Sequence, residues 1–191
     1  MPDLTTRRNH EEEIAAALLL VFAEWKDRPF DGEAFGNHII GALTGTLASV
    51  YTEAGRQFID QFAHGIDPNV TVANAKRWEI MFLPILAAEI ASTTEPGRIG
   101  AFSPARAEMA AITEVTRAIS AAEFGIAGYL ATVDDPGLRK VLRPVWYTAL
   151  DERVCPICEP LHGLGKEEWG KAFPLGPPAH PRCRCSLQWS E

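Results

Sequence analysis

The chain has 191 residues, of which 47% are hydrophobic, and its formal charge at pH 7 is −7. This composition fits one substantial globular domain, with or without a small appendage, and argues against disorder throughout. The negative charge argues against a protein that coats nucleic acid, because phosphate contacts need an excess of lysine and arginine. The apolar run at residues 14–25 is too short to cross a bilayer and follows three glutamates, so we expect a soluble, intracellular chain.

The first hundred residues are predicted to be helical. Residues 10–28 carry apolar side chains at helical spacing, with acidic residues in the first turn. Residues 34–63 indicate one long helix or two short ones, whose glycines permit close approach between helices. A further helix is expected at 70–91, where Pro84 predicts a kink or a break.

The clearest helix of the sequence spans residues 104–132. Ser103 followed by Pro104 is typical of a helix start, and the sequence Asp-Asp-Pro-Gly at 134–137 ends the apolar pattern. Residues 92–104 before this helix are predicted to be a loop. We therefore divide the chain into an N-terminal helical region, residues 1–103, and a second region, residues 104–191.

The character of the sequence changes from residue 143 onward. Residues 144–150 favour a β-strand, and the rest consists of short apolar pieces broken by glycine and proline. We expect a mainly α (α+β) fold, in which a multi-helix body carries a small C-terminal module resembling a β-hairpin or zinc knuckle at residues 143–191. The roughly forty residues from 151 onward are too few for a hydrophobic core alone, so such a module needs disulfides, a metal or a partner surface.

All four cysteines of the chain lie in this module, and their spacing is typical of a structural zinc site. Two ligand clips are separated by about twenty residues: Cys155-x2-Cys158, and His180-x2-Cys183-x-Cys185. If residues 182–187 form a strand, the last two cysteines point to the same face and can reach one ion. The histidine then either replaces one cysteine as a ligand or supports the ligands from outside. Five candidates thus compete for four tetrahedral positions.

Alternatives to this zinc site stay open at the level of sequence. His162 is a sixth candidate ligand of lower rank, and the cysteines can instead form disulfides or pack as free thiols against Trp146 and Trp169. A reducing compartment favours metal over disulfide. With four protein ligands a zinc ion would be structural rather than catalytic, and it would dominate the folding of the module.

The residues around the cysteines resemble the C-terminal signature of the phage Mu F-like head morphogenesis family, the minor capsid proteins of tailed phages and prophages. The matching positions are Trp146, Thr148, Asp151, Arg153, Cys155, Cys158, Leu161, Gly163, Pro177, Pro178, His180, Pro181, Cys183, Arg184 and Cys185. The preceding helix also looks like the family's, with its pair Thr113 and Glu114. The resemblance covers about residues 104–189.

This resemblance implies a virion protein of low copy number that assists head assembly and orderly DNA packaging or release at the portal vertex. The implied partners are the portal protein and other head proteins, with packaged DNA contacted only indirectly and no membrane. The implied location is the virion, and the cytoplasm of the bacterial host during assembly. No catalytic activity is implied.

Three charged residues beside the cysteines are candidates for supporting roles. Asp151 and Arg153 are interpreted as an ion pair that closes the turn, or as a pair in which the aspartate fixes the tautomer of His180; a solvated turn pair is the alternative. Arg184 lies between two cysteines and is expected to face away from them, either free in solvent or in contact with a carboxylate or phosphate of a partner.

Two other classes of function compete with the virion protein. In the first, the histidines, Asp151 and the cysteines form a metal-dependent hydrolase such as a nuclease, with one metal position left to water. The Cys-Pro-Ile-Cys order is not that of nucleobase deaminases, and the chain has no P-loop and no Gly-x-Ser-x-Gly motif. The second alternative is a metal-clipped interaction adaptor outside any virion.

Overall fold

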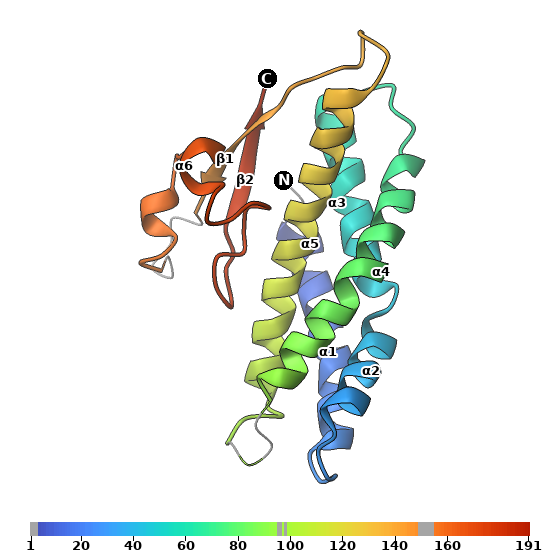
Figure 1. Cartoon of the computed structure of the whole chain (residues 1–191), viewed down its shortest axis with the longest axis vertical. Coiled ribbons are helices and arrows are strands. Elements are labelled where there is room, and N and C mark those ends of the chain that lie inside the picture. Colours follow the sequence, from blue (N-terminus) through green and yellow to red (C-terminus); the bar gives the residue numbers. More distant parts are fainter. Residues whose placement is uncertain (1–3, 95–96, 98, 149–154) are drawn as a thin grey trace.

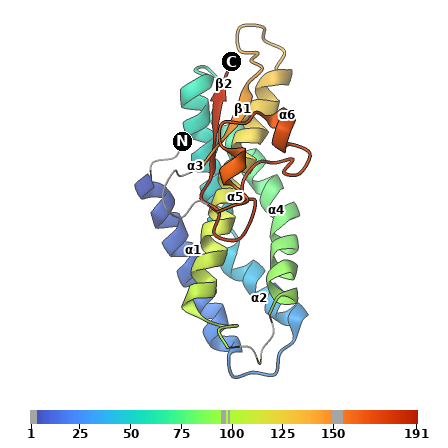
Figure 2. The ribbon, with the colours of Figure 1, turned by 90° about the vertical axis from the view of Figure 1, so that its left-hand side faces the viewer.

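The computed structural model describes residues 4–94, 97, 99–148 and 155–191 (Figure 1). Five long helices form an elongated bundle: α1 (Leu4–Trp25), α2 (Gly32–Leu43), α3 (Thr46–Phe62), α4 (Asn69–Ser92) and α5 (Pro104–Thr132). The small C-terminal module follows: β1 (Arg143–Tyr147), the 3-10 turn η1 (Glu159–Leu161), α6 (Lys166–Trp169) and β2 (Ser186–Ser190). The module lies against one side of α5 (Figures 1 and 2). The expected mainly helical fold with a small C-terminal sheet is confirmed.

Residues 34–63 form two helices, and the break between them lies at Thr44 and Gly45. Gly45 has φ +89°, a left-handed conformation that favours glycine, and it starts α3. The backbone N–H groups of Gly45 and Ala48 donate to one carboxylate oxygen of Glu79, at 2.8 and 3.2 Å. A buried side chain of α4 therefore caps the N-terminus of α3.

Of the kink or break predicted at Pro84, the break does not occur: α4 runs through this residue without interruption. Proline has no N–H to donate, so the carbonyl of Ile80 loses its helical partner. Both residues are on the exposed side of the helix, where water can satisfy this carbonyl. The solvent exposure of one face thus allows the helix to continue.

Helix α5 is the central element of the molecule. It packs on α1 and α3 with one side and faces the C-terminal module with another (Figure 2). Its start matches the prediction, since the hydroxyl of Ser103 accepts a hydrogen bond from the N–H of Arg106. Burial on two sides explains why polar residues of this helix, including Thr116 and Glu123, are inaccessible to solvent.

The two strands of the module pair antiparallel, with Trp146 opposite Leu187. The connection between them is long and contains η1, α6 and both cysteine clips. The second strand begins at Ser186, so Cys183 and Cys185 precede it instead of lying within it. The condition considered above, a strand over residues 182–187, is met only from Ser186 onward.

Candidate metal centre

The first clip is a tight turn that follows the undescribed residues 149–154. The N–H groups of Cys158 and Glu159 both donate to the carbonyl of Cys155, each at 3.0 Å, and η1 continues directly from this turn. The turn brings the two cysteines of the clip to the same side, with Cys158 buried and Cys155 partly exposed. The Cys-x2-Cys spacing thus folds as its zinc-site interpretation requires.

The second clip is a turn closed by a hydrogen bond from the N–H of Cys183 to the carbonyl of His180, at 3.1 Å. Arg182 in this turn has φ +62°, and it is the one residue other than glycine with a left-handed backbone in the described part of the chain. Backbone strain at this position has to be supported by its surroundings.

That support comes from two threonines of α5. The hydroxyl of Thr113 accepts a hydrogen bond from the N–H of Arg182 at 2.9 Å, and the hydroxyl of Thr116 donates to the carbonyl of Cys183 at 2.7 Å. The second clip is therefore attached to the helical body by its backbone. Thr113 belongs to the Thr-Glu pair of the family resemblance, and this hydrogen bond explains why a threonine is useful at that position.

The candidate ligand atoms form two groups that share one sulfur. The ligand atoms of Cys155, Cys158 and His180 lie within 4.8 Å of one another, and so do those of Cys158, Cys183 and Cys185. All five predicted ligands are thus brought together, from segments about twenty-five residues apart. The four cysteines are free thiols, so the structure contains no disulfide among them.

The histidine presents an unprotonated nitrogen to the thiols of the first clip. Nδ1 of His180 lies 2.7 Å from the carbonyl oxygen of Pro181, and since this oxygen can only accept, Nδ1 carries the proton. Nε2 lies 2.8 Å from Sγ of Cys155 and 3.2 Å from Sγ of Cys158. A backbone carbonyl that fixes the tautomer in this way is a common feature of histidines that bind metal.

The spacing of two of the sulfurs fits a tetrahedral ion. A zinc–sulfur bond of about 2.3 Å gives a tetrahedral edge of about 3.8 Å between two sulfurs. The Sγ atoms of Cys158 and Cys183 are 3.8 Å apart. The distances from Nε2 of His180 to the sulfurs of the first clip are shorter than such an edge. The donor set of thiols and one imidazole is the set that soft and borderline metals prefer.

Hydrogen bonds among the buried thiols shift their acidities in opposite directions. A hydrogen bond from the Cys158 thiol stabilises a thiolate on Cys183 and lowers the pKa of Cys183 well below its ordinary value. Donating this hydrogen bond stabilises the protonated form of Cys158 and raises its pKa, and the neighbouring thiolate adds to the rise. Metal ligands bind as thiolates, so a cation at this position would replace the protons that the sulfurs share.

A hydrophobic shell surrounds the sulfurs. Trp146, Trp169 and Leu187 are buried together with three of the cysteines, and the two indole rings pack edge to face at 5.5 Å between centroids. The Nε1 atom of Trp146 is buried and is the one such side-chain nitrogen or oxygen without a hydrogen-bond partner in the described residues. This indole N–H group lies in the same cluster as the cysteines, where a metal-bound thiolate could accept its hydrogen bond.

The remaining predicted residues lie outside this cluster. His162 does not join the ligand groups; its Nδ1 accepts a hydrogen bond from the N–H of Thr148 at 3.2 Å and lies 3.0 Å from that residue's hydroxyl. Arg184 is exposed and makes no hydrogen bond or ion pair with the described residues. Asp151 and Arg153 fall in the stretch that the structure does not describe.

A family model described as Phage Mu protein F like protein matches residues 85–188, which is more than half of the chain. The protein belongs to the phage Mu F-like family. The match begins within α4 and covers α5 and both cysteine clips of the Mu F-like region. The family is one of structural phage head proteins and is not known as an enzyme family. No curated protein and no solved structure matches the chain.

The part of the Mu F-like protein that the structure describes has no helix long and apolar enough to pass through a membrane.

Sequence reasoning missed Thr116, which anchors the second clip. Its signal was a polar residue three positions after Thr113, on the same face of a strongly apolar helix. Such a pair of threonines predicts a hydrogen-bonded contact only once the partner segment is known.

Proposed function

We propose that the protein is a minor head protein that assists head morphogenesis and DNA packaging or release at the portal vertex. The observation that supports this role is the family match over residues 85–188, which includes both the cysteine clips and the helix that carries them. The portal protein and other head proteins are the proposed partners, in the virion and, during assembly, in the cytoplasm of the host cell.

We further propose that a structural zinc ion holds the module together. Four ligands from Cys155, Cys158, His180, Cys183 and Cys185 would close its tetrahedron and leave no position for substrate. The ion would cross-link the two clips. The module has too few aliphatic residues to form a hydrophobic core that could replace this cross-link. Because the second clip is bonded to α5, this cross-link also fixes the module on the bundle.

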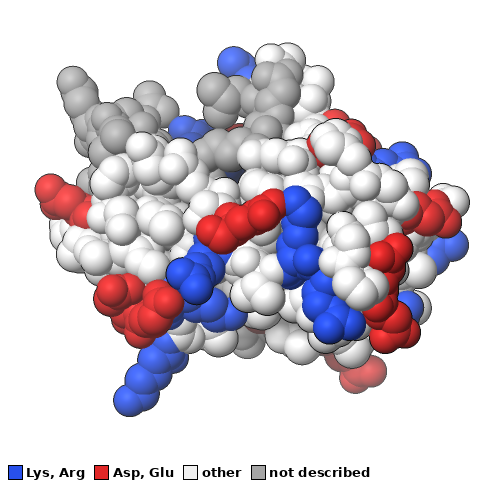
Figure 3. All heavy atoms as spheres, turned by 90° about the horizontal axis from the view of Figure 1, so that it is seen from above, with Lys and Arg blue, Asp and Glu red and all other residues white. Residues whose placement is uncertain are grey.

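The surface charge supports protein partners over direct DNA binding. On the end of the molecule seen in Figure 3, lysines and arginines lie beside aspartates and glutamates instead of forming one basic patch. Lys140, for example, pairs with Glu191 at the C-terminus. Direct DNA contact would favour an excess of positive charge on one face. We therefore assign DNA an indirect role, through the assembly.

Co-expression with the portal protein and head proteins of the same phage or prophage tests the proposed role. We expect the chain to co-purify with the portal and to enter heads in few copies, measured by mass spectrometry of purified particles. Cys158→Ser removes the sulfur common to both ligand groups and should reduce incorporation at least tenfold, whereas His162→Gln, a change outside the cluster, should not. Absence from particles together with no binding to the portal would contradict the role, and metal-dependent cleavage of DNA would favour an enzyme.

A further inference from the structure

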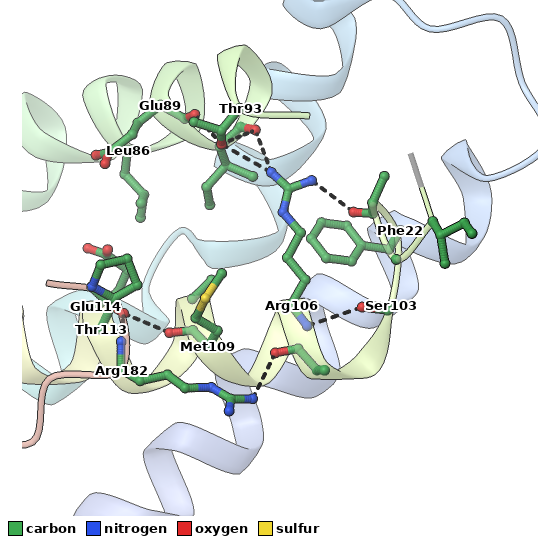
Figure 4. A pocket seen from close by; sticks show the side chains of 17 residues that line it. Phe22, Leu86, Glu89, Thr93, Ser103, Arg106, Met109, Thr113, Glu114 and Arg182 are labelled. Carbon is green, nitrogen blue, oxygen red and sulfur yellow. Dashed lines mark hydrogen bonds between the residues drawn. The ribbon is translucent and has the colours of Figure 1, made fainter. Parts of the chain in front are cut away.

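A pocket of about 590 Å³ lies between α4 and α5 and contains none of the candidate metal ligands (Figure 4). Its walls are mostly apolar and include Leu86 and Ile90 of α4 and Met109 of α5. One part of the wall is the turn formed by Pro181 and Arg182, which belongs to the second cysteine clip. The volume falls in the range of sites that bind ligands or side chains of a partner.

The charged groups at the two ends of the pocket differ in what they contact (Figure 4). At one end the guanidinium of Arg106 donates to the carbonyls of Ala101 and Ile90 and to the hydroxyl of Thr93, at 2.8 to 3.1 Å. Arg182 donates to a backbone carbonyl and to Glu108. The guanidinium groups of both arginines therefore already have partners within the chain, although Arg182 is half exposed.

At the other end of the pocket lie two carboxylates, one from each helix. Glu114 of α5 is 4% exposed and is paired with Arg117 at 2.9 Å. Glu89 of α4 is close enough for its charge to act on Glu114, and its own carboxylate has no hydrogen bond or ion pair with the described residues. This end of the pocket thus carries one carboxylate, that of Glu89, which has no direct partner in the described residues.

An apolar strip on α4 leads to this carboxylate. Trp78, Met81, Phe82, Ile85 and Glu89 follow helical spacing and therefore share one side of the helix. Met81 and Ile85 are 69% and 63% exposed, which is unusual for neighbouring large apolar side chains. At a rise of about 1.5 Å per residue, the strip from Trp78 to Glu89 is about 16 Å long. This length suits an extended contact with a peptide segment better than a small molecule.

We propose that this strip and the adjoining pocket, here called the α4/α5 groove (Trp78, Met81, Ile85, Glu89, Met109 and Glu114), bind a segment of another protein that consists of apolar residues around a lysine or arginine. The apolar side chains would cover Met81 and Ile85 and enter the pocket beside Met109. The basic side chain would pair with Glu89, next to Glu114. This recognition does not depend on the virion role, since it follows from the groove alone.

A random twelve-residue peptide library selected against the purified, full-length protein tests this proposal. We expect enriched peptides to carry a lysine or arginine flanked by apolar residues. A synthetic copy of one such peptide should bind about tenfold more weakly to Glu89→Gln, because the charge-assisted pair is lost. The matched control is Glu33→Gln on α2, since Glu33 is also exposed, has no ion pair in the described residues and is not part of the pocket wall, and it should leave the affinity unchanged.

Met109→Trp, which fills the pocket, locates the bound peptide, and we expect it to abolish binding. Circular dichroism and the unfolding midpoint show that each variant is folded. The proposal is overturned if no peptide is enriched, if the enriched peptides lack a basic residue, or if Glu89→Gln and Met109→Trp bind them as tightly as the original protein. None of these readouts involves the portal or heads, so their failure is distinct from failure of the proposed function.

Discussion

At the scale of single residues, the buried hydroxyls of α5 explain how two unlike parts of the molecule are joined. A threonine in the middle of a helix usually bonds the carbonyl one turn earlier or faces solvent. The hydroxyl of Thr116 is 2.9 Å from that carbonyl, of Ile112, but it lies closer, at 2.7 Å, to the carbonyl oxygen of Cys183 in the second clip. The side chain is fully buried, so the carbonyl of Cys183 has no access to water at this contact.

Replacing Thr116 by valine tests this link. The change keeps the shape of the side chain but leaves the carbonyl of Cys183 without its donor, so we expect a loss of about 1 to 3 kcal/mol in the free energy of unfolding. Urea denaturation measures the loss. Thr132→Val is the control, because its hydroxyl is exposed and bonds only within its own helix. Equal effects of the two substitutions would contradict the role of Thr116.

A second buried residue of α5 predicts how stability depends on pH. Burial raises the pKa of Glu123 to about 7, although Trp189 donates a hydrogen bond to its carboxylate at 3.0 Å. The folded state therefore favours the protonated acid, and stability is lost as the pH rises from about 4.5 through about 7. In Glu123→Gln the amide still accepts from Trp189 but cannot ionise, so this loss disappears.

The measurement is the difference in unfolding free energy between Glu123→Gln and the original protein, by urea denaturation between pH 4.5 and 8. We expect this difference to shift in favour of the variant by on the order of 1 kcal/mol per pH unit up to about pH 7. Taking the difference removes the contribution of Glu114, whose pKa burial also raises to about 7. A difference that does not change with pH would contradict the assignment.

At the scale of elements, the start of α3 depends on a different helix. Glu79 of α4 accepts hydrogen bonds from the N–H groups of Gly45 and Ala48, while no side chain near Gly45 in sequence caps this end. The carboxylate also lies at the positive end of the helix dipole. We expect Glu79→Ala to lower the unfolding free energy by about 1 to 2 kcal/mol and to speed amide exchange at Ala48.

The control for Glu79→Ala is Glu89→Ala on the same helix, since Glu89 is exposed and its carboxylate has no partner in the described residues. Hydrogen exchange by NMR reports the first turn of α3 directly. If amide exchange at Ala48 is the same in both variants, the cap contributes nothing and α3 is held by its apolar face alone.

The elements that the sequence predicts well are those set by local signals. Ser103 and Pro104 mark the start of α5, and the cysteine spacing indicates the two clips, because caps and ligand turns depend on residues only a few positions apart. Other features depend on partners distant in sequence. Glu79 as a cap has no local signal, and the start of β2 at Ser186 depends on its pairing with Tyr147.

At the scale of the whole molecule, the protein consists of a bundle with a large hydrophobic core and a module with a small one. The bundle core joins buried side chains from all five long helices, among them Phe22, Phe35 and Val115. The module core centres on two tryptophans and the cysteines, and Trp189 connects it to the bundle through Phe58 and Phe124. We therefore expect the bundle to keep its packing under conditions that release the module.

Removal of metal separates these two parts. If an ion cross-links the clips, a strong chelator should expose Trp146 and Trp169 and shift their fluorescence to longer wavelength, because the module has too few aliphatic side chains to stay closed. The far-ultraviolet circular dichroism at 222 nm should change little, since the long helices pack on their own core. Cys155→Ser combined with Cys158→Ser should give the shifted fluorescence without chelator and no further response to it. Loss of helical signal together with the fluorescence shift would mean that bundle and module unfold as one unit. Unshifted fluorescence in metal-free protein would show that the module stays closed without an ion.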